Sequence, residues 1–168
     1  MGNKISNVKN SKKAVMLRVG RQFLRVNHAG EPCLISNVTQ TVPDNRYTFW
    51  LADEKADEDH VDGEVLLTIR IQATRCGRAY YLCARENFRT HPYSYEVSFE
   101  KSRQATADCS TWILRRIPGE KFVLESYKFR KYCLSNQDGQ LCLQRVSRAR
   151  RDKHVTFYPI RNPEGRDR

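Results

Sequence analysis

Short stretches rich in apolar, β-branched and aromatic residues recur along the whole chain, separated by residues that form turns. Asn136-Gln137-Asp138-Gly139 and Arg75-Cys76-Gly77 are two such separators, and both contain residues that tolerate tight turns. This spacing predicts an all-β protein built from hairpins, with no helix. The predicted strands are Val15–Val19, Phe23–Val26, Leu66–Ile71, Tyr80–Ala84, Tyr95–Phe99, Phe122–Leu124 and Leu141–Val146.

The segment Leu66–Gln72 has the clearest two-residue period. It places Leu67, Ile69 and Ile71 on one side of a strand, because successive side chains point to opposite faces. We expect that side to be buried and the other side to face water.

A weak internal repeat turns this strand pattern into a topology. Similar segments recur at Tyr47–Leu51, Ser110–Leu114 and Val155–Ile160, and each follows a predicted hairpin and one earlier strand. Four strands repeated three times predict a β-trefoil, a closed six-stranded barrel with a three-hairpin cap, which leaves few open sheet edges. A β-sandwich with chance similarity between its strands is the alternative.

The length of 168 residues suits one domain. We expect the β-trefoil domain at residues 14–160, a flexible basic arm at 1–13 and a flexible tail at 161–168. No stretch approaches the roughly 20 apolar residues that cross a bilayer, and the N-terminus lacks the apolar segment of a secretory signal peptide. We therefore expect synthesis in the cytoplasm, with an unconventional route of release if the protein acts outside the cell.

The six cysteines contain no Cys-x-x-Cys pair, so a zinc ribbon or a thioredoxin-like motif has no support. Without a signal peptide, reduced thiols are the expected state. Four of them lie in short apolar runs, where free cysteine behaves as a small buried hydrophobe. These are Cys33, Cys83, Cys133 and Cys142.

Motifs of catalysis and of cofactor binding are missing from the sequence. It has no Gly-x-Ser-x-Gly, no glycine-rich phosphate loop and no His-Glu-x-x-His. The four histidines, at positions 28, 60, 91 and 154, fall in different predicted loops. We predict that the protein is not an enzyme and holds no cofactor or metal.

The segment Leu124–Asn136 reads Leu-Glu-Ser-Tyr-Lys-Phe-Arg-Lys-Tyr-Cys-Leu-Ser-Asn. It resembles the fingerprint of the interleukin-1 cytokine family, in which an apolar residue, any residue and Ser lead, after a fixed gap, to an apolar strand. Tyr80–Cys83 followed by Tyr95–Glu100 is similar to the paired strands of that family, and Trp112–Leu114 stands where an aromatic strand precedes the fingerprint. Arg130 departs from the usual Pro and Asn136 from the usual Thr.

This resemblance implies a cytokine that binds immunoglobulin-like receptor ectodomains and signals in immune or inflammatory responses. Phe157-Tyr158-Pro159 gives a second, weaker resemblance, to the fibroblast growth factors, which implies a heparin-binding ligand. The trefoil fold alone would imply neither, because it hosts many functions.

An acidic stretch, Asp53–Glu64, carries seven carboxylates in twelve residues. A calcium loop of the EF-hand type needs oxygen ligands at its third position and Gly at its sixth, where this stretch has Lys55 and Glu58. We expect a solvated loop that joins the first two repeats, since dense like charge extends a chain. Asp59-His60-Val61-Asp62 also resembles an executioner-caspase site, and cleavage after Asp62 would separate the first repeat from the others.

The N-terminal arm fits the N-myristoylation pattern through Gly2 and Ser6. A single myristoyl chain anchors weakly, so the nearby lysines would have to add an electrostatic contribution. An unmodified basic arm is the alternative. If the arm is lipidated, the protein belongs to a different class, an intracellular adaptor tethered to the cytoplasmic face of a membrane.

The strongest candidate for a binding surface is basic. Lys and Arg number 30 against 19 Asp and Glu, which gives a net charge of +11 and favours an acidic partner. We expect the segment 145–153 to be an exposed loop that meets the turn before Tyr132 on one face. The residues concerned are Lys128, Arg130, Lys131, Arg145, Arg148, Arg150, Arg151 and Lys153.

Arginine pairs with sulfate and carboxylate groups through two parallel hydrogen bonds. We therefore expect these residues to bind an acidic receptor face or heparan sulfate, or another acidic glycan, with the protein acting as a monomer. Nucleic acid is less favoured, since no nucleic-acid module is visible. The alternative is a basic surface kept only for solubility.

Overall fold

The computed structural model describes residues 12–36, 46–58, 65–89, 94–146 and 151–160. Side chains are described in these ranges except at positions 53–58 and 65. The predicted lipidation site Gly2, the predicted cleavage site Asp62, and Arg148 and Arg150 of the basic segment lie outside the described residues, as do most of the N-terminal arm and the C-terminal tail.

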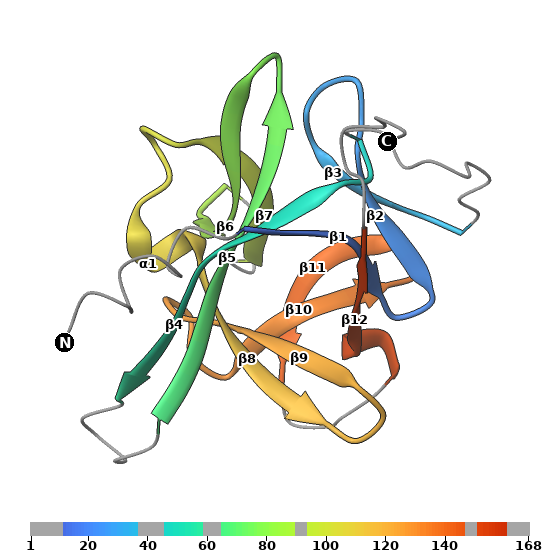
Figure 1. Ribbon diagram of the computed structural model, residues 1–168, viewed down its shortest axis with the longest axis vertical. Coiled ribbons are helices and arrows are strands. Elements are labelled where there is room, and N and C mark those ends of the chain that lie inside the picture. The colour runs from blue at the N-terminus through green and yellow to red at the C-terminus, as the bar shows by residue number, and fades with distance from the viewer. Residues whose placement is uncertain (1–11, 37–45, 59–64, 90–93, 147–150, 161–168) are drawn as a thin grey trace, which may run out of the picture.

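Strands account for nearly all of the described structure (Figure 1). Every predicted strand is confirmed, and most extend further than predicted. Two short helices that the sequence did not predict, α1 (Ala107–Ser110) and the 3₁₀ turn η1 (Arg151–Lys153), interrupt them. The strands are β1 (Lys13–Val19), β2 (Gln22–Val26), β3 (Pro32–Ile35), β4 (Phe49–Glu58), β5 (Val65–Arg75), β6 (Arg78–Asn87), β7 (Ser94–Lys101), β8 (Thr111–Ile117), β9 (Lys121–Ser126), β10 (Tyr132–Gln137), β11 (Gln140–Arg145) and β12 (Val155–Pro159).

Six strands form a closed antiparallel barrel. β1 pairs with β4, β4 with β5, β5 with β8, β8 with β9, and β9 with β12, which returns to β1. Pairs such as Val15↔Pro159 and Val15↔Phe49 place β1 between β12 and β4. This closed ring leaves no barrel edge unpaired and excludes the β-sandwich alternative.

The remaining six strands form three hairpins, β2–β3, β6–β7 and β10–β11. Each hairpin follows one barrel strand and precedes another, so the chain consists of three four-stranded units in the order β1–β4, β5–β8 and β9–β12. Strands β3, β7 and β11 contact one another and bring the three hairpins together. This is the predicted β-trefoil.

One hydrophobic core lies inside the barrel and under the hairpins. Five different barrel strands each contribute a fully buried side chain to it: Leu17, Phe49, Ile69, Trp112 and Leu124. Burying large apolar side chains from all three units makes the units interdependent. The indole of Trp112 satisfies its polar atom inside this core, because Nε1 donates to the carbonyl oxygen of Leu82 at 3.0 Å.

The cysteines are all free thiols in the structure. The predicted burial is confirmed for Cys83 and Cys133, which are fully buried, whereas Cys33 and Cys142 are half-buried. Cys109 is also fully buried, which its sequence context did not indicate.

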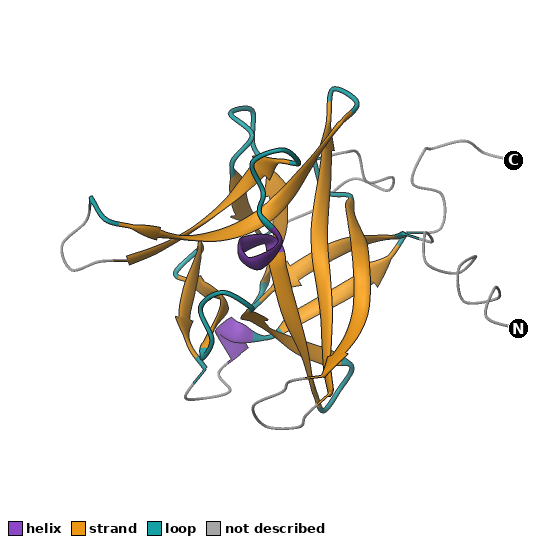
Figure 2. Ribbon diagram, turned by 90° about the vertical axis from the view of Figure 1, so that its left-hand side faces the viewer, coloured by secondary structure: helices purple, strands orange, loops and turns teal. Residues whose placement is uncertain are grey.

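The acidic stretch differs from its prediction. Residues 53–58 were expected in a solvated loop but belong to β4, which continues to pair with β5 as far as Glu58↔Val65. The two strands extend beyond the barrel as one long hairpin (Figures 1 and 2). Strand pairing is made by backbone hydrogen bonds, which do not depend on the charge of the side chains. The density of acidic residues was therefore not sufficient evidence for a loop.

The alternation predicted for Leu66–Gln72 is wrong in part. Ile69 and Ile71 are buried as expected, but Leu67 is 37% exposed while Leu66 and Thr68 are buried. The facing strand carries an extra residue between Ala52 and Lys55. A β-bulge bends and twists the strand pair, and the buried side of β5 changes opposite this irregularity.

Candidate binding surface

The turn between β9 and β10 carries three of the predicted basic residues, and local hydrogen bonds fix its shape. The backbone amide of Phe129 donates to Ser126 Oγ at 3.0 Å, and the amide of Tyr132 donates to the carbonyl oxygen of Phe129 at 3.1 Å. Lys131 has a φ of +73°, a left-handed conformation that a tight turn requires. The turn therefore presents its side chains from a defined backbone.

The turn and the end of β11 lie together. Tyr132 pairs with Arg145, and the amide of Val146 donates to the carbonyl oxygen of Lys131 at 2.8 Å. Lys128, Lys131 and Arg145 are all exposed. The structure thus brings residues from the two predicted basic segments onto one region, which we call the basic cluster, defined as Lys128, Lys131 and Arg145.

Aromatic rings underlie the basic cluster. Tyr95 of β7 contacts both Phe129, with ring centroids 4.5 Å apart, and Tyr132, with centroids 4.6 Å apart. Lys128 Nζ lies 5.5 Å from the Phe129 ring centroid, and Arg145 Cζ lies 5.9 Å from that of Tyr132. Cations at these distances are attracted to the ring faces. The three rings, Tyr95, Phe129 and Tyr132, therefore form a platform that helps to orient Lys128 and Arg145.

Tyr95 joins the second unit to the third at this platform. Burial raises the pKa of its hydroxyl, and the neighbouring Tyr132 raises it further. The Tyr95 hydroxyl therefore stays neutral at physiological pH and leaves the positive charge of the cluster intact. The sequence did not predict that these rings lie beneath the basic side chains, because Tyr95 is 34 residues from Phe129 in the chain.

Arg130 differs from its neighbours because an internal ion pair holds it. Its Nε lies 2.7 Å from Glu125 Oε2, while Arg115 Nε lies 2.8 Å from Glu125 Oε1. The Glu125 side chain is only 6% exposed. Burial by itself would raise the pKa of Glu125, but the hydrogen bonds from Arg115 and Arg130 outweigh it and hold the pKa below 4.5. Arg130 therefore neutralises an internal carboxylate.

The predicted position of Lys153 in an exposed loop is wrong. This side chain is 7% exposed, and its ammonium donates to the carbonyl oxygen of Arg145 at 2.6 Å. Lys153 is the last residue of the short turn η1, from which its side chain points inward. The carbonyl oxygen of Arg145 supplies the acceptor that a buried ammonium needs. Lys153 supports the end of β11 from below and is not part of the surface.

Arg151 is exposed but lies elsewhere. It lines a pocket of about 570 Å³ with Gly20, Gln22 and Asn136, next to the first unit. Asp152 and Arg21 also line this pocket. Of the eight basic residues predicted for one surface, the described structure therefore groups three in the basic cluster and gives Arg130, Arg151 and Lys153 other places.

Cys83, Glu100 and Cys109 form a group of possible metal ligands among the described residues, with one donor atom of each within 4.8 Å of the others. Burial raises the pKa of Cys83 far above the usual thiol range, and its contact with Cys109 adds to the shift. Arg85 Nε also donates to Glu100 Oε2 at 2.5 Å. Metals bind thiolates and free carboxylates, so a protonated Cys83 thiol beside a guanidinium-bound carboxylate favours packing over metal binding.

No helix among the described residues is long and apolar enough to cross a membrane.

No protein-family model and no curated protein matches this sequence. Solved structures do match. The chain is similar to the designed 3-fold symmetric protein ThreeFoil, with a TM-score of 0.59 and 14% identity over 88% of this chain and 99% of that one. It is also similar to Cry35Ab1, with a TM-score of 0.60 and 10% identity over 89% of this chain.

A third similar structure is the GlcNAcα1-4Gal releasing endo-β-galactosidase from Clostridium perfringens, with a TM-score of 0.61 and 11% identity over 89% of this chain. The chain spans 36% of Cry35Ab1 and 33% of the galactosidase. At such low identities these likenesses show the fold alone. Together with the closed barrel and its three hairpins, they establish a β-trefoil.

Proposed function

We propose that this protein is a non-enzymatic ligand whose basic cluster binds an acidic face of an immunoglobulin-like receptor ectodomain. The observation that carries the proposal is the placement of Lys128 and Arg145 over the Tyr95–Phe129–Tyr132 platform, with the exposed Lys131 beside them. Exposed cations over half-buried rings combine charge with contact area, and interfaces are enriched in tyrosine and arginine.

The class of partner follows from two further arguments. The net charge of +11 attracts acidic surfaces over several ångströms before contact. Two members of the cluster, Lys128 and Lys131, also lie within the segment Leu124–Asn136 that resembles the interleukin-1 family, and that resemblance supports a receptor ectodomain. The cytokine role, release from the cell and action as a monomer are parts of this proposal.

A sulfated glycan is the second candidate partner. It is favoured by the exposed Arg145 guanidinium, because arginine forms paired hydrogen bonds with sulfate as readily as with carboxylate. A membrane-tethered adaptor has no such supporting observation, since Gly2 lies outside the described residues.

The test is a triple variant, Lys128→Gln, Lys131→Gln and Arg145→Gln. Surface plasmon resonance measures its binding to a panel of purified immunoglobulin-type ectodomains and to heparin at physiological salt. We expect an ectodomain that binds the parent to bind the variant at least about tenfold more weakly, through faster dissociation. Unchanged ectodomain binding would overturn the proposal, and binding to heparin alone would favour the glycan.

A matched control removes the same charge elsewhere. Arg89, Arg116 and Lys121 are exposed and lie outside the basic cluster. Changing all three to Gln should leave affinity within about threefold of the parent, because distant exposed charges act mainly on the association rate. An equal loss in both variants would show that only the overall charge matters.

A further inference from the structure

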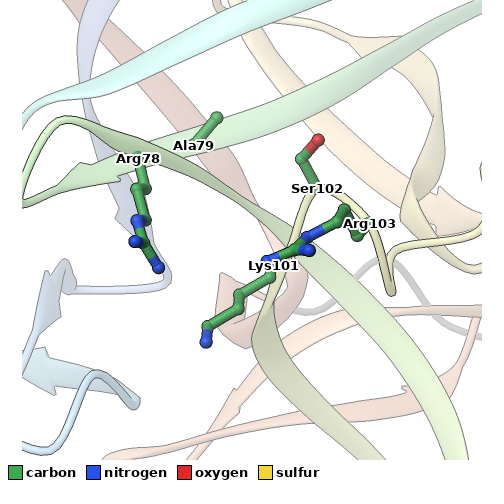
Figure 3. Close-up of a pocket in the computed structure, with 5 residues that line it drawn as sticks. All are labelled: Arg78, Ala79, Lys101, Ser102 and Arg103. Carbon is green, nitrogen blue, oxygen red and sulfur yellow. The ribbon is translucent and has the colours of Figure 1, made fainter.

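A second cationic site lies in the second unit, away from the basic cluster. A pocket of about 380 Å³ is lined by Arg78, Ala79, Lys101, Ser102 and Arg103. Arg78 begins β6 and Lys101 ends β7, and Figure 3 shows their side chains extending toward the same region. The lining contains three cations and no acidic residue.

Strand pairing is the reason these cations meet. Tyr80 pairs with Lys101, and the amide of Ser102 donates to the carbonyl oxygen of Ala79 at 3.2 Å, so the pairing continues past the end of β7. Arg103 follows in the turn and lines the same pocket as Arg78 and Lys101. Like charges gathered around one pocket repel each other, and a bound anion would relieve that repulsion.

The turn that carries Ser102 and Arg103 is anchored. The carbonyl oxygen of Lys101 accepts hydrogen bonds from the amides of Gln104 at 2.8 Å and Ala105 at 2.9 Å. Ala105 is buried and packs with Cys83 and Cys109 beneath the turn. The backbone of the pocket is therefore formed before any ligand arrives, which lowers the entropy cost of binding.

The cationic side chains of the pocket are available. Arg78, Lys101 and Arg103 are exposed, and no ion pair or hydrogen bond among the described residues engages their charged groups. The nearest acidic residue in sequence, Glu100, is bound by Arg85. Arg75, which pairs with Arg78, instead donates to the carbonyl oxygen of His28 at 3.3 Å.

We propose that this pocket binds a sugar unit that carries a sulfate or phosphate ester. Two guanidinium groups, an ammonium and the Ser102 hydroxyl are all donors, which suits a tetrahedral oxyanion. The volume lies in the range of small-molecule sites, about 300–1,000 Å³, and leaves room for a sugar ring beside the ester, against Ala79. This site is separate from the basic cluster and does not depend on the proposed function.

The test follows the backbone amides of Ala79, Ser102 and Arg103 by NMR in the full ¹⁵N-labelled chain. The probes are N-acetylglucosamine 6-sulfate, N-acetylglucosamine 6-phosphate, unmodified N-acetylglucosamine and sodium sulfate. We expect saturable shifts with at least one ester, larger than with sodium sulfate and lacking with the unmodified sugar. The ester that binds more tightly identifies the natural source as a sulfated or a phosphorylated sugar.

The double variant Arg78→Gln and Lys101→Gln should weaken ester binding at least about tenfold, since charged hydrogen bonds dominate such sites. Arg89→Gln with Lys121→Gln is the charge-matched control and should bind like the parent. The triple variant of the basic cluster should also bind like the parent, which separates this site from the proposed receptor surface. Equal shifts from sodium sulfate and the esters, or equal binding by the double variant, would overturn the proposal.

Discussion

Glu125 shows how one residue can decide whether its neighbours serve structure or binding. Its buried carboxylate accepts hydrogen bonds from both Arg115 and Arg130. Arg130 looked equivalent to Lys128 and Lys131 in the sequence, yet its guanidinium is paired with the buried Glu125 carboxylate. Runs of basic residues therefore cannot be counted as surface charge until their acidic partners are located.

Glu125→Gln should destabilise the protein by about 1–2 kcal/mol at pH 7, because Arg115 and Arg130 lose their charged acceptor while remaining partly hydrated. The lowered pKa of Glu125 means that its contribution is complete above pH 4.5 and is lost as pH falls through the folded-state pKa. Urea unfolding should show the gap between parent and variant narrowing toward pH 3. Glu120, an exposed residue, supplies the control Glu120→Gln, and a gap that stays constant with pH would refute this role for Glu125.

Cys133 makes the opposite prediction at alkaline pH. Burial raises the pKa of its thiol from 9.0 to about 11. The unfolded chain releases this proton first, so the stabilisation is complete below pH 9 and is lost as pH rises through 11. The loss amounts to about 2–3 kcal/mol. Cys133→Ala should start less stable because of the cavity it leaves, but its unfolding free energy should fall less steeply between pH 9 and 11; parallel curves would contradict the assignment.

At the scale of elements, Asn136 fastens the β10–β11 hairpin to the first unit. Its Nδ2 donates to the carbonyl oxygen of Val19 at 3.1 Å and to Gln22 Oε1 at 3.0 Å. Its Oδ1 accepts from the amide of Gly139 at 2.8 Å. Gly20, with a φ of +61°, lies so close that an added Cβ would meet Asn136 Cβ at 3.3 Å. One side chain thus fixes the turn of its own hairpin and the contact with β1 and β2.

Asn136→Ala should cost about 1–3 kcal/mol in thermal or urea unfolding, because it leaves the partners of three hydrogen bonds unsatisfied. Gln140→Ala is the matched control, since Gln140 is exposed on the same hairpin, and should change stability by less than about 0.5 kcal/mol. Similar costs for the two variants would show that the contact between the units contributes little.

The sequence predicted elements better than it predicted their ends and their surfaces. Short apolar runs and turn residues identify most of the strands, because strands that bury one face and end in tight turns leave both signals in the sequence. The extension of β4 to Glu58 escaped prediction because its support is backbone pairing with β5. The altered face of β5 depends on a bulge in the facing strand, which no local pattern of β5 records.

The sequence could predict that the candidate surface is basic, but not which residues it contains. Proximity of Lys131 to Arg145 follows from hairpin pairing, which local sequence can indicate. The position of Tyr95 under that hairpin arises only when β7 of the second unit packs against the third. The inward direction of Lys153 depends in turn on the three-residue turn η1, which is too short to leave a periodic signal.

At the scale of the whole molecule, the barrel depends on pairing between segments far apart in the chain. β1 pairs with β12 over five residue pairs, from Val15↔Pro159 to Val19↔Val155, and the amide of Ile160 donates to the carbonyl oxygen of Ala14 at 2.9 Å. The first unit is thus held on both sides, by β12 through β1 and by β5 through β4. This pairing consists of hydrogen bonds between strands, so it does not require an intact chain between β4 and β5.

The sequence suggested that cleavage after Asp62 would separate the first repeat from the others, but this strand pairing predicts that the cleaved protein stays assembled. The cut would give a fragment with β1–β4 and another with β5–β12, and each contributes buried core residues, such as Phe49 from the first and Trp112 from the second. Separating them would expose this core and unpaired barrel strands. We expect both fragments to co-elute in native size-exclusion chromatography after complete cleavage, verified on a denaturing gel.

The cleaved protein should differ from the intact one in how it unfolds and not in what it binds. Its unfolding midpoint should rise with protein concentration, because folding has become an association of two chains, whereas the midpoint of the intact protein should not depend on concentration. The basic cluster lies wholly in the second fragment, so affinity for an acidic partner should be retained while the fragments stay together. Fragments that elute separately, or a midpoint independent of concentration after cleavage, would show that the covalent link between β4 and β5 is what keeps the first unit in the barrel.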